Sequence, residues 1–313
     1  MASPGTVSVI IPTHYRNDPL RDAIRSALGQ TYDPVEVIVV DDSGEEHARS
    51  VVDEYESVTY VPLSQSRGAQ GARQAGVERA TGEYIQFLDD DDQLLASKLS
   101  RQVPVLAVDD DDVGVVYCGL RWEDGPVVLP RPGVRGDVLV DALRFDTSSC
   151  MMGTMLIERS ALDRVDLLKH DHAADDIGFK IELARVTDFD YINDVLLIRG
   201  DSAGSLSTTQ AAVAGRFEII DMYDDLYARF PEDVRREALA EAYLVAGEFA
   251  LQDAVWSTSA IRSFVTAVSY SPGFSLPYAG SLVSSLFGRL VYKLSRRLYS
   301  RLVLGSKRKG KGM

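Results

Sequence analysis

The chain has 313 residues, of which 45% are hydrophobic and 26% charged, which is enough for one large domain with an appendage and excludes a wholly disordered protein. The formal net charge of −14 disfavours nucleic acid as a partner, because phosphates would be repelled. The two cysteines, Cys118 and Cys150, have no cysteine near them in sequence, which excludes a disulfide framework and a zinc motif.

Strands and helices alternate over the first third of the chain. Apolar runs predict strands at residues 7–11, 35–40, 58–62 and 84–88, and helical spacing predicts helices at 18–30, 45–55 and 67–80. This alternation indicates parallel βαβ units. The sequence therefore predicts an α/β fold whose mostly parallel sheet is covered by helices.

The pattern is less regular beyond residue 112. A further strand is predicted at 113–119, an irregular stretch at 122–150, a strand entering a helix at 153–162, a helix at 177–185, and two helices at 211–255 that are broken near Pro231. We divide the chain into a main domain at 1–210, a helical extension at 211–255 and a tail at 256–313.

Polar residues follow three of the predicted strands. They are Pro12-Thr13-His14, Asp41-Asp42-Ser43 and the acidic run Asp89–Asp92. Ligands of open α/β sheets bind beyond the carboxyl ends of the strands. We therefore expect these three clusters to meet at one edge of the sheet and to form the binding site.

The acidic run suits a hard divalent cation. Carboxylates one residue apart at a strand end can share Mg or Mn, and such an ion stabilises a departing diphosphate. The alternative is a solvated acidic surface, because a second run, Asp109–Asp112, follows other apolar residues. An EF-hand loop does not fit, since Leu94 stands where that loop needs glycine.

Four segments together resemble glycosyltransferase family 2. VSVIIPTHYR, VEVIVVDDSG, RGAQGARQAG and GEYIQFLDDDD are similar to the family's VSVIIPTYNR, EIIVVDDGS, NxGxxxARNxG and GEYIxFLDxDD segments, in the same order. The strong resemblance covers about residues 6–93, and a looser one reaches about residue 207. It implies a GT-A fold and the transfer of a sugar from a nucleotide-sugar.

The resemblance also implies roles for the residues at the strand ends. For the donor it implies Pro12, Thr13, Asp41, Asp42, Arg73 and Asp90. For Mn or Mg it implies a DxD pair, Asp89 and Asp91. The chain departs from the family at His14-Tyr15, which replaces Tyr-Asn, and at Arg67 and Gln74, which replace asparagines. These departures concern segments that contact the donor.

A second carboxylate pair, Asp175-Asp176, resembles the family's Glu-Asp pair, whose Asp is the general base. An inverting transfer needs a carboxylate that takes the proton of the acceptor hydroxyl, and Asp176 is the first choice, followed by Asp175. Alternatively, the pair complements the dipole at a helix start. The segment 199–207, RGDSAGSLS, resembles a loop near the diphosphate, with Arg199 as its basic residue, or is a plain Ser/Gly loop.

The tail differs in charge from the rest of the chain. Ten basic and no acidic residues follow Asp253, so residues 1–253 carry −24 and residues 254–313 carry +10. Leucines recur every four residues from Leu282 to Leu302, beside a basic row from Arg289 to Arg301. A helix of this kind can lie in a membrane interface, helped by the closing KRKGKG, and the alternative is an oligomerisation helix. The uncharged stretch 263–288 contains two prolines, so we predict no membrane span there.

The specific function follows from resemblance alone. The chain has only seven lysines among 33 basic residues, which indicates a halophilic source, and it resembles haloarchaeal N-glycosylation transferases that extend dolichyl-phosphate-linked sugars. We expect transfer of a hexuronic acid from UDP-glucuronate to such a lipid-linked saccharide. The alternatives are a dolichyl-phosphate sugar synthase and a non-catalytic nucleotide-sugar-binding scaffold. Without a secretory signal, the enzyme is expected on the cell membrane, with its catalytic domain facing the cytoplasm.

Overall fold

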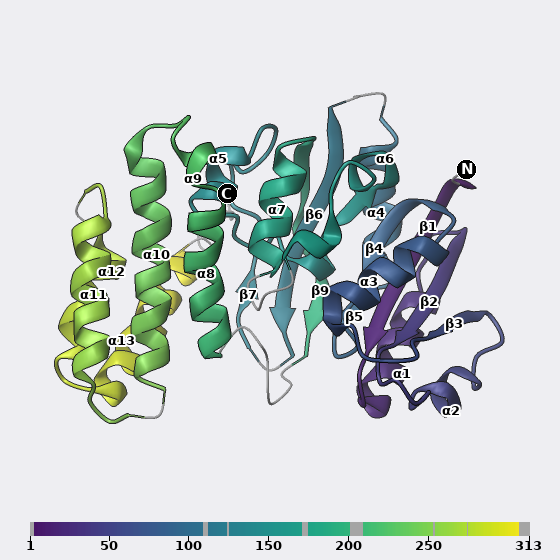
Figure 1. Cartoon of the computed structure of the whole chain (residues 1–313), viewed down its shortest axis with the longest axis horizontal. Helices are drawn as coiled ribbons and strands as arrows, with labels where there is room; N and C mark the ends of the chain where they lie inside the picture. Colours follow the sequence, from purple (N-terminus) through teal and green to yellow (C-terminus); the bar gives the residue numbers. More distant parts are fainter. Residues whose placement is uncertain are drawn as a thin grey trace. The chain divides into compact units, whose positions relative to one another are not determined.

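The computed structural model of the chain describes residues 3–108, 112–123, 125–170, 175–200, 209–252, 254–273 and 275–306 (Figure 1). The chain forms two compact units. The first comprises residues 1–142 and 146–205 and contains the sheet, and the second comprises 143–145 and 206–313 and is helical.

A mixed sheet forms the centre of the first unit. Its strands are β1 Ser3–Thr13, β2 Val35–Asp41, β3 Val58–Pro62, β4 Gly82–Phe87, β5 Gln93–Leu94, β6 Val113–Trp122, β7 Val127–Val128, β8 Leu156–Glu158 and β9 Asp188–Arg199. The order is β3-β2-β1-β4-β8-β6-β9-β5, with β7 beside β6. The strands β3, β2, β1 and β4 are all parallel, whereas β8 is antiparallel to both of its neighbours. The predicted parallel arrangement therefore holds for this half, and the other half is mixed.

Helices cover both faces of the sheet. In the first unit they are α1 Asn17–Leu28, α2 Arg49–Val52, α3 Gly68–Arg79, α4 Lys98–Leu106, α5 Leu139–Leu143, η1 Met152–Thr154, α6 Arg159–Leu162, η2 Leu167–His170 and α7 Asp175–Ala184. Successive residues of a strand point to opposite faces. Val9 and Ile11 pack in one core with Leu20 of α1, whereas Ile10 faces Gly76 of α3. A Cβ at Gly76 would lie 2.3 Å from Ile10 Cγ2, so glycine lets α3 approach the sheet closely.

Two elements differ from the sequence-based expectation. The helix predicted at 45–55 is a single turn, α2, because the preceding loop donates backbone hydrogen bonds to Asp41 and not to its own helix. The 12-residue strand β9 was not predicted, since its sequence DFDYINDVLLIR has polar residues over its first half. It is parallel to β6, and its burial comes from this long-range pairing.

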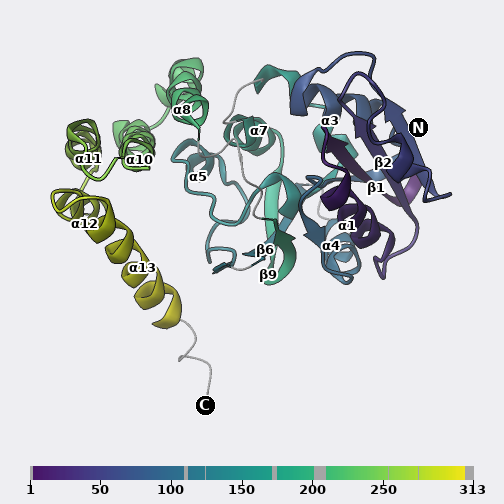
Figure 2. The same cartoon turned by 90° about the horizontal axis from the view of Figure 1, so that it is seen from below.

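The second unit is a set of helices. They are α8 Gln210–Met222, α9 Asp224–Tyr227, α10 Glu232–Ala250, α11 Thr258–Tyr270, α12 Leu276–Ser285 and α13 Arg289–Ser306 (Figure 2). The two helices predicted at 211–255 correspond to α8 and α10, with Pro231 as the N-cap of α10. Leu244, Phe264 and Tyr292 join α10, α11 and α13 in one apolar core.

A fully buried lysine joins α4 to the sheet. Lys98 Nζ donates to Gln86 Oε1 and, at 2.6 Å, to Gln102 Oε1. The amide nitrogens of the two glutamines donate in turn to the carbonyls of Gly153 and Thr154, so the network also holds η1. Burial lowers the pKa of Lys98 to about 8.

This shift makes stability depend on pH in a defined direction. Between pH 8 and 10.5 the unfolded chain keeps the Lys98 proton while the folded chain has released it, so the free energy of unfolding rises with pH over this range. Relative to Lys98→Met, the unmodified protein should gain about 2 kcal/mol in unfolding free energy from pH 7.5 to 10. Urea unfolding of both proteins at both pH values measures this change. A difference that stays constant with pH would show that Lys98 keeps its proton.

Candidate active site

The polar clusters after β1, β2 and β4 meet at one edge of the sheet, as their positions in the sequence predict. The amide of Asp42 donates to the carbonyl of Thr13 at 2.9 Å, which joins the ends of β2 and β1. Thr13 Oγ1 donates to Asp90 Oδ2 at 2.7 Å, which joins the ends of β1 and β4. Pro12 lies in β1 immediately before these contacts.

Asp41 shapes the loop that follows β2. Its buried carboxylate accepts hydrogen bonds from the amides of Ser43 and Ala48, at 3.0 and 2.6 Å, and from the Tyr60 hydroxyl at 2.7 Å. Burial by itself would raise the pKa of Asp41, but these hydrogen bonds outweigh it and hold the pKa below its usual value. In this structure Asp41 therefore organises residues 43–48 behind the site.

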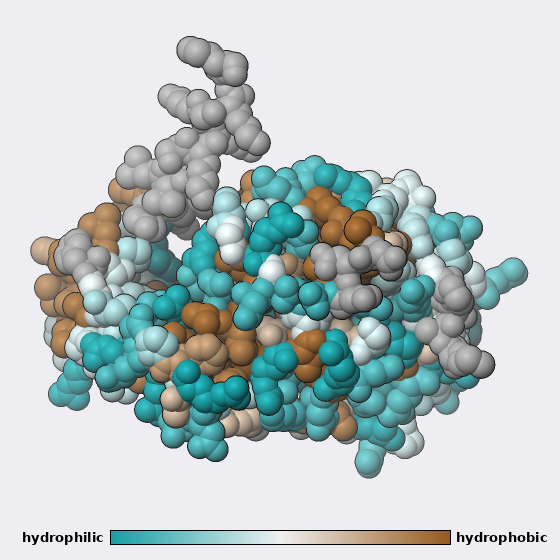
Figure 3. All heavy atoms as spheres, turned by 90° about the horizontal axis from the view of Figure 1, so that it is seen from above, coloured by the Kyte–Doolittle hydropathy of each residue, from teal (hydrophilic) through white to brown (hydrophobic). Residues whose placement is uncertain are grey.

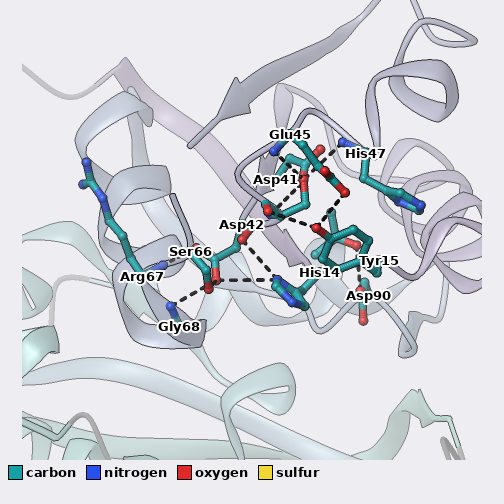
Figure 4. A network of polar contacts seen from close by, with 12 residues as sticks. His14, Tyr15, Asp41, Asp42, Glu45, His47, Ser66, Arg67, Gly68 and Asp90 are labelled. Carbon is teal, nitrogen blue, oxygen red and sulfur yellow. Dashed lines mark hydrogen bonds and ion pairs between the residues drawn. The ribbon is translucent and has the colours of Figure 1, made fainter. Parts of the chain in front are cut away.

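Asp42 organises the start of α3. Its Oδ1 accepts from the Arg67 amide at 2.6 Å, and its Oδ2 accepts from the Ser66 hydroxyl and the Gly68 amide at 2.8 and 3.0 Å. Gly68 has a φ of 73°, a conformation that favours glycine. Figure 4 shows Asp42 between this loop and His14, whose Nδ1 lies 3.1 Å from the Asp42 carbonyl.

Three rings line the open edge next to Asp42. The Tyr15 ring lies edge-on to His14 and His47, with centroid distances of 4.7 and 4.8 Å. Tyr15 has a φ of 58°, which is costly for a bulky residue, and its hydroxyl donates to Glu45 at 2.7 Å. Tyr15 and His47 were not among the predicted site residues. The departure from the family's Tyr-Asn at positions 14 and 15 is the sequence signal that points to this cluster.

The acidic run lies between two arginines. Arg73 of α3 donates to Asp89 Oδ1 at 2.8 Å, and Arg16, at the start of α1, pairs with Asp90 and, at 3.3 Å, with Asp91. Burial raises the pKa of Asp90, and the Arg16 guanidinium opposes this shift. Arg16 was not predicted as a site residue, because its contact with the run joins residues about 75 positions apart.

The end of β9 contacts the acidic run through Gly200. Asp92 is buried and accepts a hydrogen bond from the Gly200 amide at 3.0 Å, while burial and then Asp89 and Asp91 raise its pKa strongly. A Cβ on Gly200 would lie 2.1 Å from the Asp91 carbonyl oxygen, so only glycine fits there. Apart from Arg199 and Gly200, the predicted loop at 199–207 lies outside the described residues.

The four carboxylates of the run differ in access to solvent. Asp89 and Asp91 have side chains that are 38% and 18% exposed, whereas Asp90 and Asp92 are buried. The two carboxylates that reach solvent are therefore the two that the sequence predicts as a DxD pair, and their role in metal binding stays a prediction. Over the described ranges, no group of three or more His, Cys, Asp or Glu side chains is arranged around a metal position. The two accessible carboxylates nevertheless have the hard oxygen donors that Mg and Mn prefer, so the residues fit such an ion.

The second carboxylate pair lies at the start of α7. Asp175 begins the helix, and its side chain lies outside the described part. Asp176 is partly exposed, and Lys180, one turn later, places Nζ 3.5 Å from Asp176 Oδ2 and 3.0 Å from the Cys150 carbonyl. Gly153, three residues after Cys150, packs against Asp92. Asp176 is thus connected to the acidic run only indirectly, through Lys180 and residues 150–153.

Residues 8–165, which contain the three strand ends and the acidic run, match the family model described as glycosyl transferase family 2. The chain belongs to this family. The assignment agrees with the four segments that suggested it, and the protein is a glycosyltransferase.

Two curated relatives show the range of similarity. The uncharacterized glycosyltransferase RP339 of Rickettsia prowazekii is 26% identical over 303 residues, which cover 93% of this chain and 91% of the relative. The GalNAc(5)-diNAcBac-PP-undecaprenol beta-1,3-glucosyltransferase of Campylobacter jejuni is 36% identical over 99 residues, which are 30% of this glycosyltransferase and 32% of the relative. The latter match thus spans about a third of that enzyme.

Solved structures confirm the fold. S. aureus TarS 1–349 in complex with UDP-GlcNAc has a TM-score of 0.59 and 19% identity, with 97% of this chain and 92% of TarS covered. The mannosyltransferase PcManGT of Pyrobaculum calidifontis, in complex with GDP-Man and Mn2+, has a TM-score of 0.57 and 22% identity, with 97% and 87% covered. The predicted α/β GT-A fold is therefore confirmed for this glycosyltransferase.

Proposed function

We propose that this enzyme transfers a sugar from a UDP-linked donor, with inversion, onto a lipid-linked saccharide at a membrane surface. The observation that carries the proposal is the solvent-accessible pair Asp89 and Asp91, set between Arg16 and Arg73 at the carboxyl edge of the sheet. A bound nucleotide diphosphate needs positive charge and hydrogen-bond donors around its oxygens. The two carboxylates can hold a metal ion, and the two arginines offer N–H donors.

The donor would lie along the ends of β1 and β2. Pro12, Thr13 and Asp42 border the base, and the rings of His14 and Tyr15 offer an apolar edge for a flat heterocycle. Asp41 would act indirectly, by holding the loop that carries His47. The UDP-GlcNAc complex of the structurally similar TarS supports a uridine nucleotide.

The diphosphate would lie at the acidic run. Asp89 and Asp91 would hold Mn or Mg, which supplies positive charge to the departing nucleotide when bound. Asp90 would keep Arg16 in place, and the guanidinium groups of Arg16 and Arg73 would bind phosphate oxygens through paired N–H donors. The Mn2+ in the PcManGT complex supports a divalent ion.

Asp176 would remove the proton from the acceptor hydroxyl as its oxygen attacks the anomeric carbon. Lys180 orients this carboxylate, since the lysine is itself anchored on the Cys150 carbonyl. Asp175 is the alternative base. A lipid-phosphate acceptor would need no base, so the role of Asp176 separates a saccharide acceptor from a dolichyl-phosphate sugar synthase.

The acceptor is proposed from relatives. The matched Campylobacter enzyme is named for an undecaprenol-diphosphate-linked acceptor, which supports a lipid-linked saccharide here. UDP-glucuronate as donor, dolichyl phosphate as carrier and a haloarchaeal source remain predictions from the sequence. So do membrane contact through residues 256–313 and a catalytic domain that faces the cytoplasm.

A donor panel tests the proposal. The purified protein would be incubated with membrane lipids and labelled UDP-glucuronate, UDP-glucose, UDP-N-acetylglucosamine or GDP-mannose, with Mn, Mg or a chelator, and label in the lipid phase would be counted. We expect metal-dependent transfer from a UDP-sugar. Donor binding without transfer from any member of the panel would instead support the non-catalytic scaffold.

A further inference from the structure

An exposed apolar surface, here called the apolar ridge, lies in the helical unit. It consists of Val255, Trp256, Leu286, Phe287, Leu290, Leu294 and Leu298. Val255, Phe287 and Leu290 are 72%, 70% and 72% exposed, and Trp256 is 53% exposed. Figure 3 shows hydrophobic surface at the left-hand end of the view, where Figure 1 places α11, α12 and α13. A contiguous apolar surface of this kind marks an interaction site.

The backbone joins the two parts of the ridge. The Arg289 amide donates to the Val255 carbonyl at 2.8 Å, and the Arg289 guanidinium donates to the Gln252 carbonyl at 2.6 Å. Gly288, with a φ of 86°, separates α12 from α13, and a Cβ there would lie 2.7 Å from the Val255 carbonyl oxygen. The turn before α13 is therefore fixed against the segment that carries Trp256.

Among the described residues, α13 packs on the rest of its unit through a face other than the one that carries its leucines. Tyr292 stacks on Phe264 at 5.4 Å and donates to Glu248, and Arg296 pairs with Glu248 at 2.8 Å. Leu290, Leu294 and Leu298, four residues apart, stay exposed. The leucine row expected from the sequence is not continuous, because Leu282 packs on the core of the unit and the helix is broken at Gly288.

Charge identifies the partner. No acidic residue follows Asp253 in the sequence, and the ridge is bordered by Arg289 and the exposed Lys293. Apolar side chains with a tryptophan, flanked by basic residues, are typical of a protein surface that enters the interface of an anionic bilayer. A symmetric dimer through the ridge would bring the two basic margins together, which disfavours a second copy as occupant. No helix within the described ranges is long and apolar enough to cross a membrane.

We propose that the apolar ridge inserts into the headgroup region of an anionic lipid bilayer, with Trp256 and Phe287 at its centre and Lys293 among the lipid phosphates. This inference rests on the proposed function for its purpose, which is to hold the enzyme where a lipid-linked acceptor is found. It adds to the predicted leucine row three residues that lie outside that row, namely Val255, Trp256 and Phe287.

Fluorescence tests the insertion directly. The chain has two tryptophans, so Trp122→Phe leaves Trp256 as the sole tryptophan, whose emission can be excited selectively over that of the tyrosines. Vesicles of phosphatidylglycerol and phosphatidylcholine should shift its emission to the blue, and brominated lipids should quench it. A blue shift that needs no vesicles and grows with protein concentration would show self-association through the ridge and would overturn the proposal.

Vesicle co-sedimentation measures the membrane partition coefficient of variants with and without the ridge residues. Trp256→Ser combined with Phe287→Ser should lower the partition coefficient at least tenfold, whereas Val108→Ser, an exposed apolar residue of the first unit, should leave it unchanged. Lys293→Glu should weaken binding to anionic vesicles and not to phosphatidylcholine alone. Equal partitioning of all variants would overturn the proposal. Calorimetric binding of the UDP-sugar in the same samples reports on the donor site, so failure of the ridge and failure of the proposed function are distinguishable.

Discussion

Asp91→Asn should lower kcat/KM for sugar transfer by about 100-fold or more. Asp91 is one of the two carboxylates of the acidic run that reach solvent. Asparagine would offer the divalent ion one neutral oxygen in place of a negatively charged carboxylate, so the ion that neutralises the diphosphate would bind more weakly. The fold should tolerate the change, since the side chain is not part of the core. Initial rates at saturating Mn, together with thermal unfolding of the variant, measure both effects.

The second acidic run provides the matched control. Asp112 is exposed, and its backbone carbonyl accepts hydrogen bonds from Thr187 and Asp188, which the substitution keeps, so Asp112→Asn should keep full activity. Asp90→Asn should lower the melting temperature as well as the activity, because Asp90 is buried between Thr13 and Arg16. Equal activity of the Asp91→Asn and Asp112→Asn variants would contradict the assignment of the site.

Asp176→Asn should lower kcat for transfer to a saccharide hydroxyl by about 10²–10⁴-fold and leave donor binding unchanged. The amide cannot accept the proton that the hydroxyl must lose. Single-turnover rates and calorimetric donor binding separate the two quantities. Asp163→Asn, an exposed carboxylate at the end of α6, is the control and should behave like the unmodified enzyme.

A variant of Lys180 tests the role of Asp176 in a second way. Lys180→Met removes the contact with Asp176 and the hydrogen bond to the Cys150 carbonyl, so it should reduce kcat more than it changes KM for the donor. If Asp176→Asn transfers sugar at the normal rate, the acceptor oxygen needs no base. That result would favour a phosphate acceptor and the sugar-synthase alternative.

The parallel half of the fold was predictable because its signals are local. Val9, Ile10 and Ile11 form an uninterrupted apolar strand, as expected where both faces are covered, and the polar residues stand where the strands end. The meeting of these ends follows from the parallel order alone. The strand β9 and the pairs of Arg16 with the acidic run depend on contacts between distant residues, and no local pattern encodes them.

The position of the candidate site in the fold was predictable from the sequence, but the orientation of its side chains was not. Four consecutive aspartates do not reveal which of them face solvent, because this depends on the turn after β4 and on Gly200. Asp41 and Asp42 were expected to bind the donor, and the structure shows that their carboxylates hold neighbouring loops. Similarly, the position of Gly288 in the sequence does not show that the following turn packs on Val255.

The central claim is that a UDP-sugar bound beside Asp89 and Asp91 is turned over and not merely held. The most direct test counts UDP released against sugar recovered in the lipid phase, with the donor selected by the panel, Mn present and acceptor lipid added or omitted. The account predicts equal amounts of the two products, formed only when the acceptor lipid and the metal are present. Saturable donor binding with no UDP formed under any of these conditions would contradict it.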